Sequence, residues 1–456
     1  MNDFSRYMTP GSCGFLIGVG GVSMSPLAEV LSGMGLRISG SDMNDGANVE
    51  RLREKGISVA IGHRAENLGA DTQFVVRTAA VHDDNPEVAE ARRRGLPVFE
   101  RTEAWGAIMR DYKNAVCISG THGKTTTTSM VTQILMAASM DPTVMIGGTL
   151  PLLHAGHRVG SGDTIVMESC EYCNSFLNFY PTVAVVLDIE ADHLDFFHDL
   201  SEIEASFREF ASHVPEGGTI IANLDDENTM DALRPLGREM LTFGLSDKAD
   251  IWAKNIVQLG TQTDFDVIYQ GRKFTHVQLQ VPGIHNVKNA LAACAASICV
   301  GCGPLAVKYG LAAFRGAGRR FEFKGKFNGA DIYDDYAHHP GELKALLDAA
   351  MPLGYKRTIV IFQPHTYSRT KALFDDFAAQ LRRPDLTILA EIYAAREKNT
   401  IGISSRDLAQ VIPNALYFGS FDEIVKTVRW TAQPGDLILT VGAGDIYKVG
   451  ERILEK

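Results

Sequence analysis

The fold is decided by the stretch AVCISGTHGKT at residues 115–125. Its apolar first half is typical of a buried strand, and the helical pattern that follows it continues through Leu135. Glycines in the turn between strand and helix let backbone amides face phosphate oxygens, and Lys124 adds a positive charge. The stretch therefore predicts an α/β domain that binds phosphate at this turn.

The spacing of this turn differs from that of an ordinary P-loop, in which the first glycine stands five residues before the second. Here Gly120 stands three residues before Gly123. A solvated turn that contains Gly-Lys-Thr by chance is the alternative, but the strand before it and the helix after it favour phosphate binding. We expect a nucleotide to contact Gly120, Thr121, His122, Gly123, Lys124, Thr125 and Thr126.

Acidic residues gather where two further apolar runs end. Glu168 ends one run, and the end of the run at residues 183–189 is crowded by Asp188, Glu190, Asp192, His193 and Asp195. Ligands collect at the carboxyl ends of parallel strands, and oxygen ligands with one imidazole suit Mg²⁺ or Mn²⁺ beside a triphosphate. Helix caps and solvated acids explain several members of the group, but not Glu168 together with His193. We therefore expect Thr125, Glu168 and His193 to serve metal binding.

The first hundred or so residues alternate short apolar runs with polar helical stretches, which predicts a parallel sheet. Gly18, Gly20 and Gly21 follow the first run, and Ser41 and Asp42 close the next strand. This arrangement is typical of folds that bind a dinucleotide or another diphosphate. A tight strand-to-helix turn needs glycine whether or not a ligand binds, so these residues alone leave diphosphate binding open.

The rest of the chain indicates two further features of an α/β fold. Period-two patterns at residues 250–282 predict antiparallel strands attached to the nucleotide-binding region. The glycine-rich stretch at residues 315–318 marks a hinge, and strands again alternate with helices beyond it. We predict three α/β domains, of which the first and third are Rossmann-like and the second is of the P-loop type, at residues 1–112, 113–317 and 318–456.

Composition limits the class of protein. Of the 456 residues, 45% are hydrophobic and 22% are charged, as in ordinary globular proteins. The net charge of −11 argues against a nucleic-acid partner, and no apolar run has the length of a membrane span. Seven scattered cysteines are not the disulfide framework of a small secreted domain. We expect a cytoplasmic protein with reduced thiols and without an obligate protein partner.

Several short motifs follow one another over nearly the whole chain. They are Gly-Thr-His-Gly-Lys-Thr at 120–125, Glu190-Ala191-Asp192-His193, His285-Asn286-x-x-Asn289, Gly318-Arg319-Arg320-Phe321, Asp334-Asp335-Tyr336-x-His338-His339-Pro340 and Gly442-Ala443-Gly444-Asp445. Taken together they resemble the Mur ligase family. Within it, Phe362-Gln363-Pro364-His365 with Ser368-Arg369-Thr370 is similar to the branch whose members join L-alanine to UDP-N-acetylmuramate.

The resemblance implies a domain that binds the UDP-sugar, a central ATPase domain and a C-terminal domain that brings the amino acid. It implies that ATP and Mg²⁺ are used to phosphorylate the carboxylate of UDP-N-acetylmuramate. The amine of L-alanine would then attack this acyl-phosphate, and the product would enter peptidoglycan synthesis. The carboxylate needs this activation because it is a poor electrophile, and cations must neutralise the charge that moves during phosphoryl transfer.

The resemblance also implies roles for single residues. Lys124 and Arg320 would contact phosphates, Thr125 and Glu168 would hold one Mg²⁺, and His193 would serve a second. Asp335 or His339 could accept the proton of the amine, and the residues leave that choice open. The remaining implied contacts are Asn286, Asn289 and Asp334 for ATP, Gly18, Gly20, Gly21, Ser41 and Asp42 for the UDP-sugar, and His339, His365 and Arg369 for the substrates. His365 and Arg369 would meet the L-alanine end, and Asp334 or Asp335 would come from the closing C-terminal domain.

A few positions depart from the family's pattern. Ser23 replaces a glycine of the first loop, Cys173 stands where many relatives carry an acid, and Thr366 stands where some use arginine. Residues 204–208 contain no lysine for the metal-bridging carbamate of some sister ligases, so we expect no carbamate. The Cys-x-x-Cys pairs at 170/173 and 299/302 would have to converge to bind zinc, and we expect no zinc.

Three alternative functions compete with this one. A sister ligase that attaches a recycled peptide to the same UDP-sugar is the nearest, and the Gln-Pro-His segment argues against it. A nicotinamide dehydrogenase would explain the first glycine loop and Asp42, but not Lys124, Glu168 or His193. A nucleotide-binding scaffold without activity would have lost the catalytic side chains, which are present here.

Overall fold

The computed structural model describes residues 3–78, 80–194, 196–395 and 397–455. Within these residues the strands form three sheets, of five, ten and six strands. Contacts between Cα atoms divide the chain into two compact units. The first comprises Met1–Ala191, Asp199–Phe243 and Ala292–Val307, and the second comprises Asp192–His198, Gly244–Leu291 and Lys308–Lys456.

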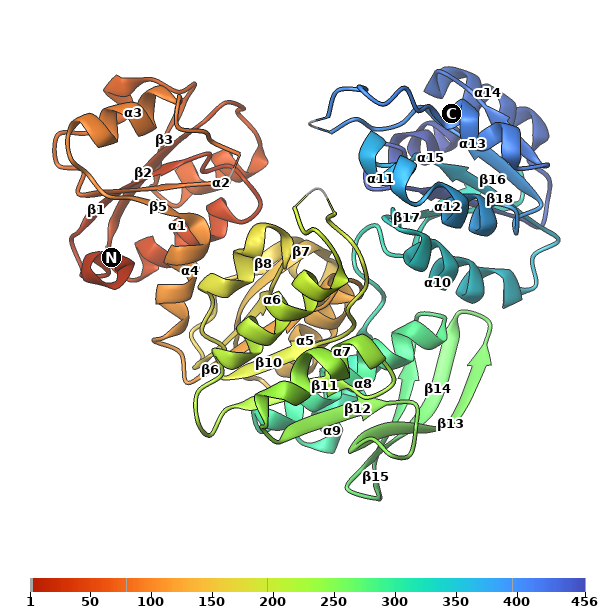
Figure 1. Ribbon diagram of the computed structural model, residues 1–456, viewed down its shortest axis with the longest axis horizontal. Coiled ribbons are helices and arrows are strands. Elements are labelled where there is room, and N and C mark those ends of the chain that lie inside the picture. Colours follow the sequence, from red (N-terminus) through yellow and green to blue (C-terminus); the bar gives the residue numbers. More distant parts are fainter. Residues whose placement is uncertain (1–2, 79, 195, 396, 456) are drawn as a thin grey trace. The chain divides into compact units, whose positions relative to one another are not determined.

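The first sheet lies in the first unit and is parallel throughout. Its order is β3-β2-β1-β4-β5, so the direction of chain progression reverses between β1 and β4. Such a switch point is where ligands bind in open α/β sheets. The strands are β1 (Cys13–Ile17), β2 (Arg37–Asp42), β3 (Ser58–Ile61), β4 (Phe74–Arg77) and β5 (Val98–Glu100), connected by α1 (Met24–Gly33), α2 (Ala47–Glu54) and α3 (Pro86–Arg93) and followed by α4 (Arg101–Met109) (Figure 1).

Seven strands of the second sheet also lie in this unit, in the order β12-β11-β10-β6-β9-β7-β8. The central strand β6 is apolar and buried almost throughout, as expected for a parallel strand that is covered on both faces. The strands are β6 (Asn114–Ser119), β7 (Thr143–Leu150), β8 (Ala155–Arg158), β9 (Thr164–Glu168), β10 (Val183–Val186), β11 (Thr219–Asn223) and β12 (Met240–Gly244), and the helices are α5 (Lys124–Ala137), α6 (Leu200–Ser212) and α7 (Glu227–Leu233).

The second unit opens with three antiparallel strands, as the period-two pattern predicted. Buried and partly exposed residues alternate along β14, because only one face of this part of the sheet is covered. The strands are β13 (Ile251–Leu259), β14 (Gln262–Tyr269) and β15 (Arg272–Leu279), and α8 (Ile284–Cys299) and α9 (Pro304–Ala313) follow in the chain.

The third sheet has the order β16-β17-β21-β18-β19-β20, and only the pair β16–β17 is antiparallel. Successive residues of its strands alternate between two buried clusters, one shared with α10, α12 and α13 and the other with α14 and α15 (Figure 1). The strands are β16 (Glu322–Phe327), β17 (Ala330–Asp335), β18 (Arg357–Phe362), β19 (Leu386–Leu389), β20 (Ala415–Tyr417) and β21 (Asp436–Val441), with α10 (Pro340–Ala350), α11 (Tyr367–Ala372), α12 (Phe374–Leu381), α13 (Ser405–Val411), α14 (Phe421–Thr431) and α15 (Tyr447–Leu454).

The predicted fold class is confirmed, since each of the three sheets is parallel or mixed and is combined with helices. The exact domain boundaries stay predictions. Among the described residues, no helix has both the length and the apolar character needed to cross a membrane. Short 3-10 helices complete the described elements at Phe4–Tyr7, Ala65–Asn67, Pro151–Leu153, Tyr172–Asn178, Arg234–Leu236 and Met351–Leu353.

Candidate active site

The predicted phosphate loop lies between the end of β6 and the start of α5. Gly120 and Gly123 have φ angles of 142° and 77°, which L side chains rarely adopt. A Cβ atom on Gly120 would also lie 2.8 Å from the Cβ atom of Leu187. The path of the loop therefore requires glycine at both positions.

Lys124 lies at the first residue of α5 and points back into the loop. Its Nζ donates hydrogen bonds to the carbonyl oxygens of Gly120 and Thr121, the latter at 3.1 Å. It also lies 2.9 Å from a carboxylate oxygen of Glu171, whose side chain is 3% exposed. Burial alone would lower the pKa of Lys124, but Glu171 and then Glu168 raise it above its ordinary value. The ammonium is therefore charged when a phosphate approaches.

Thr125 and Glu168, two of the predicted metal ligands, lie next to each other. Thr125 Oγ1 donates to Glu168 Oε1 at 3.0 Å, and the amide of Gly147 donates to Glu168 Oε2 at 2.6 Å. A hydroxyl and a carboxylate held in place are the hard oxygen donors that Mg²⁺ prefers. The donor set of this pair therefore fits the predicted metal.

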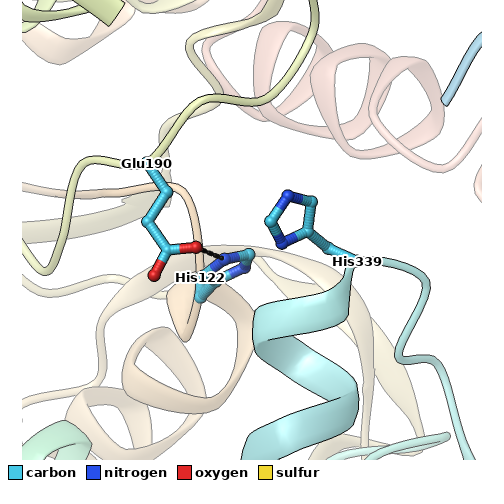
Figure 2. Close-up of side chains that lie close together, drawn as sticks. All are labelled: His122, Glu190 and His339. Atoms are coloured by element: carbon cyan, nitrogen blue, oxygen red, sulfur yellow. Dashed lines mark hydrogen bonds and ion pairs between the residues drawn. The ribbon is translucent and has the colours of Figure 1, made fainter. Parts of the chain in front are cut away.

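Residues that follow β10 form hydrogen bonds with the phosphate loop. Asp188 accepts a hydrogen bond from the amide of His122 at 2.7 Å, and burial raises the pKa of its carboxyl to about 6. His122 Nε2 lies 3.1 Å from Glu190 Oε2, and Figure 2 shows the carboxylate directed at the ring. Thr121 Oγ1 accepts from the amide of Glu190 at 2.9 Å. Asp188 and Glu190 thus hold the phosphate loop in one conformation.

The first glycine loop is held by the two residues predicted to bind substrate at the end of β2. The amide of Gly20 donates to Asp42 Oδ2 at 2.9 Å, and the amide of Gly18 donates to the carbonyl oxygen of Ser41 at 2.8 Å. Gly18 has a φ angle of 79° and Gly21 follows in the same turn. Ser41 and Asp42 therefore support the loop, and their predicted contact with substrate stays a prediction.

Sequence reasoning missed Glu87, a buried acid whose side chain contacts Ser41. The Glu87 side chain is 0% exposed, and its Oε2 accepts from Ser41 Oγ at 2.7 Å. The same oxygen lies 2.8 Å from His63 Nδ1, and Glu87 Oε1 accepts from Asn67 Nδ2 at 2.6 Å. Glu87 is the second residue of α3 and follows the polar residues Asp83, Asp84 and Asn85, so nothing local in the sequence indicates a buried role.

In the second unit, Asp334 and Asp335 at the end of β17 form hydrogen bonds with other residues of the same unit. Arg319 Nε donates to Asp334 Oδ2 at 2.8 Å, and its other nitrogens donate to the carbonyl oxygens of Gly442 and Gly444. Asp335 accepts from the amides of Phe321 and Ala337, each at 2.8 Å. These bonds fix the turn that carries Arg320, whose Nη1 lies 3.4 Å from Glu342 Oε1.

The titration of Asp335 gives a prediction about stability. Burial raises the pKa of its carboxyl from 3.8 to about 6. Between those values the folded chain keeps a proton that the unfolded chain releases, so this group's contribution to stability falls as the pH rises through that window. The free energy of unfolding of the wild type minus that of Asp335→Asn should therefore fall by about 3 kcal/mol when the pH rises from 4 to 7.

Denaturant unfolding at several pH values measures this difference. Asp376→Asn is the matched control, because Asp376 is exposed on α12 of the same unit. Parallel pH profiles for the wild type and Asp335→Asn would contradict the prediction.

Arg369, predicted to bind a substrate carboxylate, contacts a carboxylate of its own chain. Its Nη2 lies 2.9 Å from Asp192 Oδ1, and both side chains are nearly buried. Burial alone would raise the pKa of Asp192, but Arg369 holds it well below its usual range. Arg369 Nη1 lies 3.2 Å from His365 Nδ1, and the amide of His193 donates to Asp192 Oδ1 at 2.7 Å. The structure thus brings together His365, Arg369 and the segment with His193.

Three more predicted residues lie in the second unit, where two of them are paired. Asn286 Nδ2 donates to the carbonyl oxygen of Pro282 at 2.7 Å, and Asn289 Nδ2 lies 3.4 Å from Asn286 Oδ1. His339 is the N-cap residue of α10, as its place at the start of the helix in Figure 2 shows. Asp195 lies outside the described residues.

The predicted residues thus form several small groups, each within one unit. In the first unit, Lys124, Thr125 and Glu168 meet beside the glycines of the phosphate loop, and Thr126 is buried in the first turn of α5. Sequence reasoning missed Glu171 and Gly147. Glu171 follows Glu168 by three residues, which was the available signal, whereas nothing local to Gly147 connects it to a carboxylate 21 residues later.

Comparison with known proteins identifies the family to which these groups belong. Models of the Mur ligase family, catalytic domain, of the Mur ligase middle domain and of the Mur ligase, glutamate ligase domain match residues 16–113, 118–297 and 319–444. Together they span most of the chain, and the phosphate loop and Glu168 lie within the second match.

Individual relatives match over nearly their whole length. UDP-N-acetylmuramate–L-alanine ligases of Agathobacter rectalis and Acetivibrio thermocellus are each 46% identical over 445 residues, which are 96% of this chain and 97% and 95% of theirs. The crystal structure of a UDP-N-acetylmuramate-alanine ligase from Thermotoga maritima is 28% identical, with a TM-score of 0.79 over 97% of this chain and 98% of that one. A murein peptide ligase from Psychrobacter arcticus, 24% identical with a TM-score of 0.68 over 97% and 98% of the two chains, shares the fold. The chain belongs to the Mur ligase family.

Proposed function

We propose that this chain is an ATP-dependent ligase that joins the carboxylate of UDP-N-acetylmuramate to the amine of L-alanine in peptidoglycan precursor synthesis. The arrangement of the charged Lys124 beside Thr125 and Glu168 carries the proposal that it uses a nucleoside triphosphate. The substrates are those named for relatives that are 46% identical over almost the whole chain.

In the first step, a carboxylate oxygen of UDP-N-acetylmuramate attacks the γ-phosphorus of ATP, and the bond from that phosphorus to ADP breaks. Lys124 and Arg320 supply positive charge for the phosphate oxygens on which negative charge redistributes. Thr125 and Glu168 would hold Mg²⁺, which when bound neutralises further charge on the phosphates. The glycines of the loop leave the backbone amides open to the same oxygens.

In the second step, the amine of L-alanine attacks the acyl carbon, and the carbon–oxygen bond to phosphate breaks. The amine must have lost a proton, and Asp335 and His339 are the candidates to accept one. Both oxygens of Asp335 already accept backbone amides, so its use as a base would require those bonds to weaken. Arg369 and His365 are proposed to contact the amino acid, and Arg369 would exchange Asp192 for the carboxylate of L-alanine.

Gly147 gives a prediction that tests the position of Glu168. A Cβ atom on Gly147 would lie 2.5 Å from Glu168 Oε1, so Gly147→Ala must displace the carboxylate. We expect the Mg²⁺ concentration for half-maximal activity to rise about tenfold or more, as for loss of other groups that orient metal ligands. Gly33→Ala is the control, because nothing lies within 4 Å of a Cβ atom there. An unchanged Mg²⁺ dependence would contradict the role of this contact.

Phosphate release from ATP tests the proposed function. The assay contains UDP-N-acetylmuramate and Mg²⁺, and L-alanine, glycine, L-serine and the recycled tripeptide are compared as acceptors. We expect release with L-alanine to exceed that with glycine by about 10-fold or more, because one methyl group contributes about 1–3 kcal/mol to selectivity. Release with the peptide alone would instead indicate the recycling ligase, and no release with any acceptor would favour a binding scaffold.

A further inference from the structure

Arg101 connects the start of α4 to the turn between β1 and α1, two segments of the first unit that are distant in sequence. It is the first residue of α4, directly after β5, and its side chain is partly buried. Its Nη1 donates to the hydroxyl of Ser23 at 2.5 Å. Trp105, one helical turn later, donates from Nε1 to the carbonyl oxygen of Ser23 at 3.3 Å. The start of α4 is therefore attached to the turn between β1 and α1.

Within the described residues, every other partly buried arginine contacts a carboxylate or a backbone carbonyl oxygen, whereas Arg101 contacts neither. Several contact carboxylates at 2.6–2.8 Å, as in Arg51–Glu29, Arg77–Asp83, Arg319–Asp334 and Arg357–Asp436. Others donate to backbone carbonyl oxygens, namely Arg94, Arg208 and Arg238. Within the described residues, Arg101 forms no ion pair, and the neighbouring Glu100 is paired with Arg77 at 2.8 Å. Burial lowers the pKa of the Arg101 guanidinium. A desolvated cation without a counter-ion is unfavourable unless a ligand supplies the negative charge.

The position of Arg101 shows where that negative charge would lie. The strand order reverses between β1 and β4, and ligands bind outside the carboxyl ends of the strands at such a point. The turn at residues 18–23 follows β1 on one side of this point, and Arg101 follows β5 on the other. A guanidinium has five N–H donors, and within the described residues only one hydrogen bond uses them.

We propose that Arg101 binds the diphosphate of the UDP-sugar, opposite the glycines of the first loop. The proposal rests on the proposed function, which supplies a substrate with a diphosphate. The planar guanidinium can donate two parallel hydrogen bonds to phosphate oxygens, which an ammonium cannot do. It also gives a role to Ser23, which departs from the glycine common in the family: its hydroxyl accepts from Arg101 and holds the guanidinium at the turn.

Direct titration with UDP and with uridine, without ATP, tests this role. For Arg101→Met we expect the Kd for UDP to rise about 50-fold while the Kd for uridine stays within about twofold, since only UDP carries the diphosphate. Arg101→Lys should recover part of the loss. In turnover, the KM for UDP-N-acetylmuramate should rise and the KM for ATP should not. Arg93→Met is the control, because Arg93 is 73% exposed in the same unit and pairs with Glu90.

The possible results separate this role from others. Equal weakening of UDP and uridine would show a structural role, and loss confined to UDP-N-acetylmuramate would place the contact on the muramate carboxylate. Either result, or unchanged binding, would overturn the proposal. If Arg101→Met does not fold, Arg101→Lys decides, with an expected rise of several-fold in the Kd for UDP and none for uridine. If the wild type binds UDP but releases no phosphate with any acceptor, the proposed function fails and the assignment of Arg101 does not.

Discussion

Replacing Lys124 by alanine is expected to lower kcat for phosphate release by about 10³-fold, because one positive group next to the transferred phosphoryl contributes on that scale. The same change removes the ammonium that contacts the buried Glu171 carboxylate. Leaving that carboxylate without its cation should lower the free energy of unfolding by about 3 kcal/mol. Steady-state kinetics and denaturant unfolding measure the two effects.

A double variant separates catalysis from stability. Lys124→Ala with Glu171→Gln removes the buried charge together with its partner, so most of the stability should return while kcat stays low. Lys113→Ala is the matched control, since Lys113 is 77% exposed just before β6. Recovery of activity in the double variant would show that Lys124 acts only by supporting Glu171, and would contradict its contact with phosphate.

Glu168→Gln is expected to lower kcat by about 100-fold or more at a fixed Mg²⁺ concentration. The glutamine oxygen can accept from the amide of Gly147 and its NH₂ group can donate to Thr125 Oγ1, which reverses that bond. The side chain lacks the negative charge that a bound Mg²⁺ needs. The Mg²⁺ concentration for half-maximal rate should therefore rise, with little change in melting temperature. Titration of activity with MgCl₂ measures this shift.

Glu209→Gln serves as the control for Glu168→Gln, because Glu209 is exposed on α6 in the same unit. An unchanged kcat and Mg²⁺ dependence in Glu168→Gln would contradict the assignment of this carboxylate as a metal ligand. A large fall in melting temperature would instead indicate that Glu168 serves mainly to hold Thr125 and Gly147.

The phosphate loop was predictable because its chemistry is local in sequence. The apolar strand, the two glycines and Lys124 lie within eleven consecutive residues, and the following helix brings Thr125 under the loop. A strand-end acid such as Glu168 could be placed at the same edge, since parallel strands end together. These are the features in which sequence position and spatial position agree.

The partners of the predicted residues could not be read from the sequence. Ser41 and Asp42 are adjacent, yet one side chain bonds to Glu87 and the other to the amide of Gly20, because successive residues of a strand point to opposite faces. Asp334 is predicted to contact ATP, and the fold pairs it with Arg319, a partner that the sequence does not indicate. Such pairs depend on which segments the topology brings together, and periodicity carries no information on that.

The transfer of oxygen from substrate to phosphate tests the central claim most directly. UDP-N-acetylmuramate labelled with ¹⁸O in its carboxylate is turned over with ATP, Mg²⁺ and L-alanine, and the released phosphate is analysed by mass spectrometry. Activation through an acyl-phosphate predicts one ¹⁸O atom in each phosphate, because the carboxylate oxygen that attacked the γ-phosphorus leaves with it. Unlabelled phosphate released together with the amide product would contradict this account.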